Sequence, residues 1–160
     1  MRTIQAKPIT QEAFAPYGAF ASILEPTGFE LGGFYRDQVL YPTSGRMPVA
    51  FSPLAVPKPE KMIVSMAEYH NYTPEIVLPM DDDAVIYVAP ASKAPVPELT
   101  EAFLVPKGTV VRLNVGVWHL VAMPVNNPVL HVLIALPERT YLNDCTVVTY
   151  DRKAQIEIVL

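Results

Sequence analysis

The chain contains 17 prolines among 160 residues, and they limit what it can fold into more than any other feature. Proline lacks a backbone N–H and clashes with the preceding helical turn, so helix interiors tolerate it poorly. Few stretches are long enough, or free enough of proline, for a helix of three turns. One short helix is predicted at 11–15, where Thr10 is a good N-cap and Pro16 ends the segment. We therefore predict an all-β protein with one or two short helices.

Short apolar runs rich in β-branched residues lie between turn residues and predict strands. Many short strands at regular spacing are typical of a sandwich or barrel. The length favours a single domain over 1–160. The predicted strands are 18–23, 47–51, 62–68, 75–78, 84–89, 102–105, 109–113, 120–123, 129–135, 146–149 and 155–159. The predicted separators are 53–59, 71–74, 81–83, 90–97 and 126–128, and we expect 81–83 to be a solvated hairpin turn.

Charge and composition exclude several classes of protein. The net charge is −4 and there is no basic run, which argues against binding to nucleic acid or to an anionic membrane surface. No apolar run reaches 18 residues, and no secretory signal follows Met1. Cys145 is the single cysteine, so an internal disulfide and a cysteine-based zinc site are excluded, and we expect a buried, apolar role for it. These features predict a soluble, cytoplasmic protein.

Two of the three histidines, His70 and His119, lie in sequence surroundings that suggest chemistry. Residues i and i+2 of a strand share a face, so Glu68 and His70 should point the same way. The turn at 71–74 then brings Glu75 to the start of the next strand. His119 follows a predicted tight turn at 114–116. His131 lies within an apolar run and is predicted to be a core residue.

The spacing of these residues resembles the two sequence motifs of the cupin superfamily. The resemblance implies a cupin-type β-barrel, which is a double-stranded β-helix or jelly roll. Residues Glu68, Asp82, Asn114 and Met123 replace the His, Gly, Pro and Asn of the motifs. The first motif is matched by Glu68-x-His70, four residues, Glu75, six residues and Asp82, and the second by Gly108, five residues, Asn114-x-Gly116, two residues, His119, three residues and Met123.

Within the cupins, the chain resembles the ureidoglycolate lyase family. The likeness rests on the segments 10–18, 68–70, 78–80, 117–119 and 143–145. It implies a homodimeric enzyme of purine breakdown and allantoin degradation that splits ureidoglycolate into glyoxylate and urea. The chain departs from the family pattern at 81–82, 112–114 and 120–121, and it has Glu75 where glutamine is usual. The resemblance therefore indicates a divergent member.

The candidate catalytic residues are Glu68, His70, Glu75 and His119. Releasing urea requires removing the hydroxyl proton and protonating the departing nitrogen, and imidazole or carboxylate groups can do both. Alternatively, His70, Glu75 and His119 could hold a divalent metal such as Zn, Mn, Fe or Ni.

The candidate substrate-binding residues are Arg112, Asn114 and Trp118. Arg112 could clamp a carboxylate if its side chain faces inward. Trp118 has simple packing as its alternative role. The leading hypothesis is an enzyme acting on ureidoglycolate or a related small carboxylate-bearing metabolite. A non-catalytic cupin that binds a small molecule, and a metal-dependent cupin isomerase or oxygenase, remain alternatives.

Overall fold

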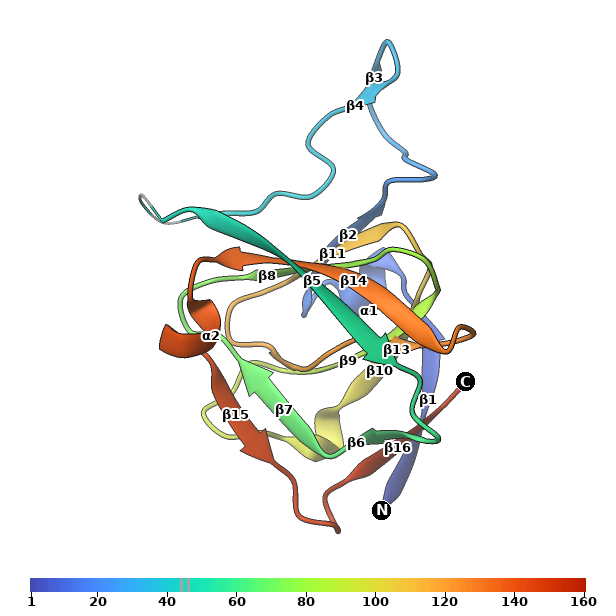
Figure 1. Ribbon diagram of the computed structural model, residues 1–160, viewed down its shortest axis with the longest axis vertical. Coiled ribbons are helices and arrows are strands. Elements are labelled where there is room, and N and C mark those ends of the chain that lie inside the picture. Colours follow the sequence, from blue (N-terminus) through green and yellow to red (C-terminus); the bar gives the residue numbers. More distant parts are fainter. Residues whose placement is uncertain (44, 46) are drawn as a thin grey trace.

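The computed structural model describes residues 1–43, 45 and 47–160. Its strands curl around a common interior, and its helices are short (Figure 1). This confirms the prediction of an all-β, cupin-type fold with short helices. The helices are α1 (Gln11–Phe14), α2 (Thr140–Asn143) and the 3₁₀ turn η1 (Pro97–Leu99). The Thr10 side chain accepts a hydrogen bond from the Ala13 N–H, as a predicted N-cap should.

The five-stranded sheet is antiparallel throughout and forms one wall of the interior. Gly18 begins its first strand, so close to the neighbouring strand that an added Cβ would lie 1.8 Å from the Arg112 carbonyl oxygen. Only glycine can occupy such a position. In order across the sheet, its members are β2 (Gly18–Ser22), β11 (Thr109–Leu113), β8 (Glu75–Pro79), β14 (Val129–Pro137) and β5 (Val49–Pro57).

The larger sheet forms the facing wall and carries both chain termini. Its order is β15 (Thr146–Thr149), β7 (Met66–Tyr69), β12 (Trp118–His119), β9 (Ala84–Ala89), β10 (Glu101–Val105), β1 (Arg2–Pro8), β16 (Ile156–Val159) and β6 (Met62–Val64), with β13 (Met123–Pro124) also paired to β9. Strand β1 pairs in parallel with β10 and β16. No strand is predicted from the sequence at β1, because Ile4 and Ala6 alone do not form a recognisable apolar run.

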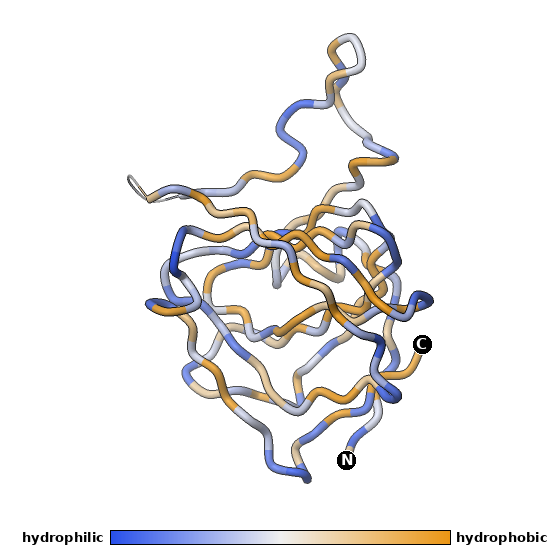
Figure 2. Tube along the Cα trace, in the orientation of Figure 1, coloured by the Kyte–Doolittle hydropathy of each residue, from blue (hydrophilic) through white to orange (hydrophobic). Residues whose placement is uncertain are grey.

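Strand β9 is the centre of the core because it is buried on both faces. Ile86 and Val88 pack into the interior between the sheets, whereas Val85 and Tyr87 pack into a second apolar cluster. Apolar stretches accordingly follow the curled strands, and hydrophilic stretches are frequent in the loops (Figure 2). No helix among the described residues is both long and apolar enough to cross a membrane.

The predicted separator at 53–59 is wrong, because β5 continues through it to Pro57. Within the described part of the chain, β5 is an edge strand that pairs only with β14, with Pro53 opposite Leu133 and Pro57 opposite Val129. Proline is tolerated on an edge strand because the side without a partner needs no N–H donor. Strands 84–89, 109–113 and 146–149, by contrast, have the predicted bounds.

The predicted strand at 120–123 is also wrong, because strand pairing is interrupted there. His119 lies opposite Val88 and Met123 lies opposite Val85. The four residue steps from His119 to Met123 therefore match only three steps along β9. One extra residue is thus accommodated between β12 and β13, as in a β-bulge. Bulges change the direction of side chains, and this one borders the candidate site described below.

The chain bends at 81–83 and Asp81 is exposed, as expected of a solvated turn, but Asp82 is not solvated. Asp82 is 4% exposed and accepts hydrogen bonds from the backbone N–H groups of Asn126 and Asn127, at 2.7 and 2.8 Å. Burial raises the pKa of Asp82, but the hydrogen bonds from Asn127 and Asn126 outweigh it and leave the pKa below its usual value. Asp82 therefore joins two loops that are far apart in the sequence.

We predict that Asp82→Ala lowers the free energy of unfolding by about 1–3 kcal/mol, because two backbone donors lose their acceptor. Since the pKa of Asp82 is lowered by folding, its contribution should be present at neutral pH and lost as the pH falls through the folded-state pKa. Denaturant unfolding at pH 7 measures the change. The exposed Glu60→Ala is the control and should stay within about 0.5 kcal/mol of wild type. Equal midpoints for Asp82→Ala and Glu60→Ala would contradict the prediction.

Candidate active site

Strand β7 and the turn after it present Glu68 and His70 on one face, as predicted. Tyr69 points the other way and packs on Trp118, with ring centroids 4.5 Å apart. The chain turns after His70 and enters β8 at Glu75. Glu75 shares its face with Val77, so its carboxylate points into the interior and is only 7% exposed. The alternation of the two strands thus brings the three polar residues together.

His119 is delivered by the tight turn that precedes β12. The Val117 N–H donates to the Asn114 carbonyl at 3.2 Å, and Gly116 has φ of +78°, which glycine adopts readily. The Gly116 N–H also donates to the His70 carbonyl at 2.8 Å, so the two motifs are joined through their backbones. His119 then pairs across the sheet with Glu68.

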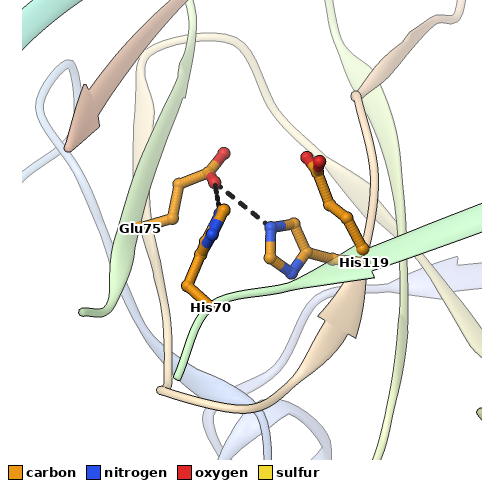
Figure 3. Close-up of side chains that lie close together, drawn as sticks. His70, Glu75 and His119 are labelled. Atoms are coloured by element: carbon orange, nitrogen blue, oxygen red, sulfur yellow. Dashed lines mark hydrogen bonds and ion pairs between the residues drawn. The ribbon is translucent and has the colours of Figure 1, made fainter. Parts of the chain in front are cut away.

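The two imidazoles converge on one carboxylate oxygen (Figure 3). Glu75 Oε2 lies 3.0 Å from His70 Nε2 and 3.1 Å from His119 Nε2. Counting one ligand atom from each of Glu68, His70, Glu75 and His119, all four atoms lie within 4.8 Å of one another. The residues predicted as catalytic or metal-binding therefore form a single cluster, which we call the His–Glu cluster.

The hydrogen bonds of the two Nδ1 atoms determine which nitrogen of each imidazole faces the centre of the His–Glu cluster. His70 Nδ1 lies 2.6 Å from the Asp144 carbonyl oxygen, and His119 Nδ1 lies 2.8 Å from the Val117 carbonyl oxygen. A carbonyl oxygen only accepts, so each Nδ1 must carry a proton. The neutral rings therefore direct the lone pairs of Nε2 toward Glu75 Oε2, which is itself an acceptor. Three acceptors meeting at one point require positive charge between them, supplied either by protons on Nε2 or by a bound cation.

The pKa shifts of His70, Glu75 and His119 agree with the need for positive charge between their acceptor atoms. Burial raises the pKa of Glu75, but the imidazoles of His119 and His70 outweigh burial and bring it down to about 2. Burial lowers the pKa of both histidines, yet the nearby Glu75 carboxylate more than compensates, and each pKa ends above its usual value. Glu75 is therefore an anion at neutral pH. The donor set of two imidazoles and a carboxylate fits a divalent metal ion.

Three members of the cluster, Glu68, His70 and Glu75, line a cavity of about 290 Å³ with mainly apolar walls. Both Leu120 and Val121 line it, which regular strand alternation would forbid and the interruption after His119 allows. No lysine or arginine is among the described residues that line it. The lining residues are Leu54, Glu68, His70, Glu75, Leu120, Val121, Ile134, Leu136, Tyr141 and Cys145.

Cys145 has a polar role, in contrast to the apolar one expected for it. Its thiol is partly exposed and donates to Glu68 Oε2, with Sγ 2.9 Å from the oxygen. Burial and the adjoining Glu68 carboxylate raise the pKa of Cys145 to about 12, so the thiol keeps its proton at neutral pH. Sequence reasoning also missed Tyr141, which lines the cavity from α2. Its proximity depends on a long-range approach of α2 that no local pattern reveals.

The three residues predicted to bind substrate do not reach this cavity. Arg112 lies opposite Ile76 in the sheet, on the face away from Glu75, and hydrogen-bonds to Leu40 O and Asn114 Oδ1. Trp118 is buried in the second apolar cluster and donates to Ser92 Oγ at 3.0 Å. Asn114 lies in the turn before His119. We therefore leave Arg112, Asn114 and Trp118 out of the proposed site.

His131 is not the core residue that was expected. Strand β14 turns Leu130 and Val132 inward, and His131 between them faces solvent with its side chain 61% exposed. Its Nδ1 pairs with the Asp81 carboxylate. The apolar neighbours that suggested burial are the alternate residues of one strand, which occupy the opposite face.

The curled sheets and the His–Glu cluster define a cupin-type protein with a candidate metal centre. Comparison with known families adds a narrower grouping, because the family model described as ureidoglycolate lyase matches residues 38–157. The chain therefore belongs to the ureidoglycolate lyase family. The matched segment contains every residue of the His–Glu cluster.

Named relatives are similar over most of their length. The chain is 30% identical over 129 residues to the ureidoglycolate lyase of Pseudomonas aeruginosa, covering 74% of this chain and 75% of that one. It is 31% identical over 131 residues to the ureidoglycolate lyase of Pseudomonas savastanoi pv. phaseolicola, covering 74% of each chain. Identity at this level fits a divergent member of the family.

Proposed function

We propose that the protein splits ureidoglycolate into glyoxylate and urea at the His–Glu cluster. The observation that carries this proposal is the meeting of two Nε2 atoms at one Glu75 oxygen beside a small cavity that His70 and Glu75 line, within a chain of the ureidoglycolate lyase family. The relatives are named as lyases, so we prefer this reaction to a non-catalytic binding role and to an isomerase or oxygenase reaction.

The reaction needs one proton moved between two atoms of the substrate. The hydroxyl on the central carbon loses its proton, the carbon–nitrogen bond breaks to leave the aldehyde of glyoxylate, and the ureido nitrogen gains a proton to leave as urea. We assign the proton transfer to Glu68, which belongs to the cluster and is less buried than Glu75. The Cys145 thiol holds Glu68 Oε2 in place. A positioned acid–base group of this kind typically contributes about 100- to 10,000-fold.

We further propose that His70, Glu75 and His119 hold a divalent metal ion. When bound, the metal would polarise the substrate hydroxyl and oppose the charge of its carboxylate. Two features support this: the three acceptor atoms face one another, and the described cavity lining offers no lysine or arginine to a carboxylate substrate. The apolar walls restrict the access of water to the reacting atoms.

The activity prediction compares matched histidine variants. Purified protein supplied with divalent metal should release urea and glyoxylate from ureidoglycolate, and His119→Ala should reduce kcat/KM by at least about 100-fold, because losing a proposed metal ligand should cost more than the ~10–100-fold of losing a second-shell partner. His131→Ala should match wild type, because His131 is exposed and outside the cavity. Absence of urea release by the metal-supplemented wild type would overturn the proposed reaction.

The metal prediction concerns Glu75 alone. Glu75→Ala should lose affinity for Mn²⁺ or Zn²⁺ by more than the ~10–100-fold typical of losing a second-shell partner. Calorimetric titration of the metal-stripped protein measures this, and Glu60→Ala should bind as wild type does. Wild-type affinity in Glu75→Ala would remove Glu75 from the ligand set.

We also propose that the protein works as a homodimer in the cytoplasm, in the purine breakdown that its family suggests. The arm that carries β3 (Glu30–Leu31) and β4 (Phe34–Tyr35) projects from the barrel and includes apolar stretches (Figures 1 and 2). Phe29 and Phe34 on the arm are 57% and 65% exposed. Exposed apolar side chains grouped in this way are typical of an interaction surface.

Light scattering should therefore give about twice the chain mass of 17.7 kDa. Phe34→Ser should weaken the association by removing apolar contact area, and Glu12→Ser, at an exposed position on α1, should not. A wild-type mass of one chain at micromolar concentration would contradict the dimer.

A further inference from the structure

His70 is held at its outer nitrogen by a segment that is remote in the sequence. Strand β7 ends at Tyr69, so His70 lies just beyond the strand and pairs with no strand among the described residues. Its Nδ1 instead donates to the carbonyl of Asp144, which directly follows α2. His119 differs, because its Nδ1 donates to Val117, two residues earlier in the same turn. The orientation of the His119 ring is thus set within its own turn, whereas that of the His70 ring depends on Asp144, which is distant in the sequence.

The Asp144 side chain binds the turn that follows His70. One carboxylate oxygen accepts from the Asn71 N–H and the other from the Tyr72 N–H, both at 2.8 Å. Hydrogen bonds to a carboxylate are roughly twice as strong as those between neutral groups. Together with the carbonyl bond to the His70 ring, these contacts connect Asp144 to three consecutive residues.

The neighbouring residues extend this arrangement. Cys145 donates to Glu68, and β15 then begins at Thr146, which pairs with Tyr69. Asp144 is itself anchored, because its N–H donates to the Thr140 carbonyl at 2.8 Å. The end of α2 therefore supports β7 and the following turn from Glu68 to Tyr72.

We propose that Asp144 is a positioning residue that directs His70 Nε2 into the His–Glu cluster. Its carboxylate fixes the turn, and its carbonyl fixes the Nδ1–H tautomer and the plane of the ring. The catalytic meaning of this role depends on the proposed function, but the geometric role does not. Loss of the carboxylate should free the turn and let the His70 ring move while His119 stays in place.

The test follows the two Nδ1–H protons by NMR in metal-free protein. Wild type should show both signals, because each proton is hydrogen-bonded and shielded from exchange. Asp144→Ala should lose the His70 signal and keep that of His119, and its affinity for Zn²⁺ should fall by about 10–100-fold, as for other second-shell groups. Asp144→Asn keeps one acceptor oxygen and should be intermediate. Leu142→Ala, at a position 73% exposed on α2, is the control and should match wild type.

Two outcomes would overturn the proposal. A folded Asp144→Ala with both Nδ1–H signals and wild-type Zn²⁺ affinity would show that the Asp144 carboxylate does not position His70. Equal loss of both signals would show a general structural role, and if Asp144→Ala does not fold, the same two criteria apply to Asp144→Asn. Failure of the wild type to cleave ureidoglycolate would leave this proposal standing, because the NMR measurement needs no turnover.

Discussion

The site depends on a conflict between acceptors that only positive charge resolves. Both histidines use their Nδ1–H groups on backbone carbonyls, so both Nε2 atoms turn toward the same oxygen of Glu75. A carboxylate this deeply buried would be costly without compensation. The cluster therefore needs positive charge, from protons on Nε2 or from a bound cation, and the surrounding fold keeps its members in place.

Distant parts of the barrel cooperate to hold the cluster. The turn at Gly116 links the His119 motif to the His70 carbonyl, and the interruption after His119 turns two apolar residues into the cavity wall. The end of α2 supports the opposite side through Asp144 and Cys145. Because these supports come from separate segments, the site forms only when both sheets have assembled.

The sequence was sufficient for those parts of the site that follow from alternation and turn chemistry. Glu68 and His70 share a face because they are two residues apart, and Asn114 to Gly116 form the tight turn that their residue types favour. To predict where His131 and Arg112 point, one must know which face of each strand is turned inward. The apolar residues that flank each of them in the sequence indicate that face. For example, Leu130 and Val132 flank His131 and take the buried face themselves.

Other features depend on contacts that no local pattern encodes. The prolines of β5 suggested a loop, and they are tolerated only because β5 lies at a sheet edge. The support of His70 by Asp144 joins residues 74 positions apart. Tertiary pairing decided these features.

The most direct test is the anomalous diffraction of crystals grown with Mn²⁺ or Zn²⁺ and measured at the absorption edge of the metal. We expect a single peak between the rings, at about 2.0–2.2 Å from both Nε2 atoms and from a Glu75 oxygen. Metal-saturated crystals without density at that point, or with either ring turned away from Glu75, would contradict it.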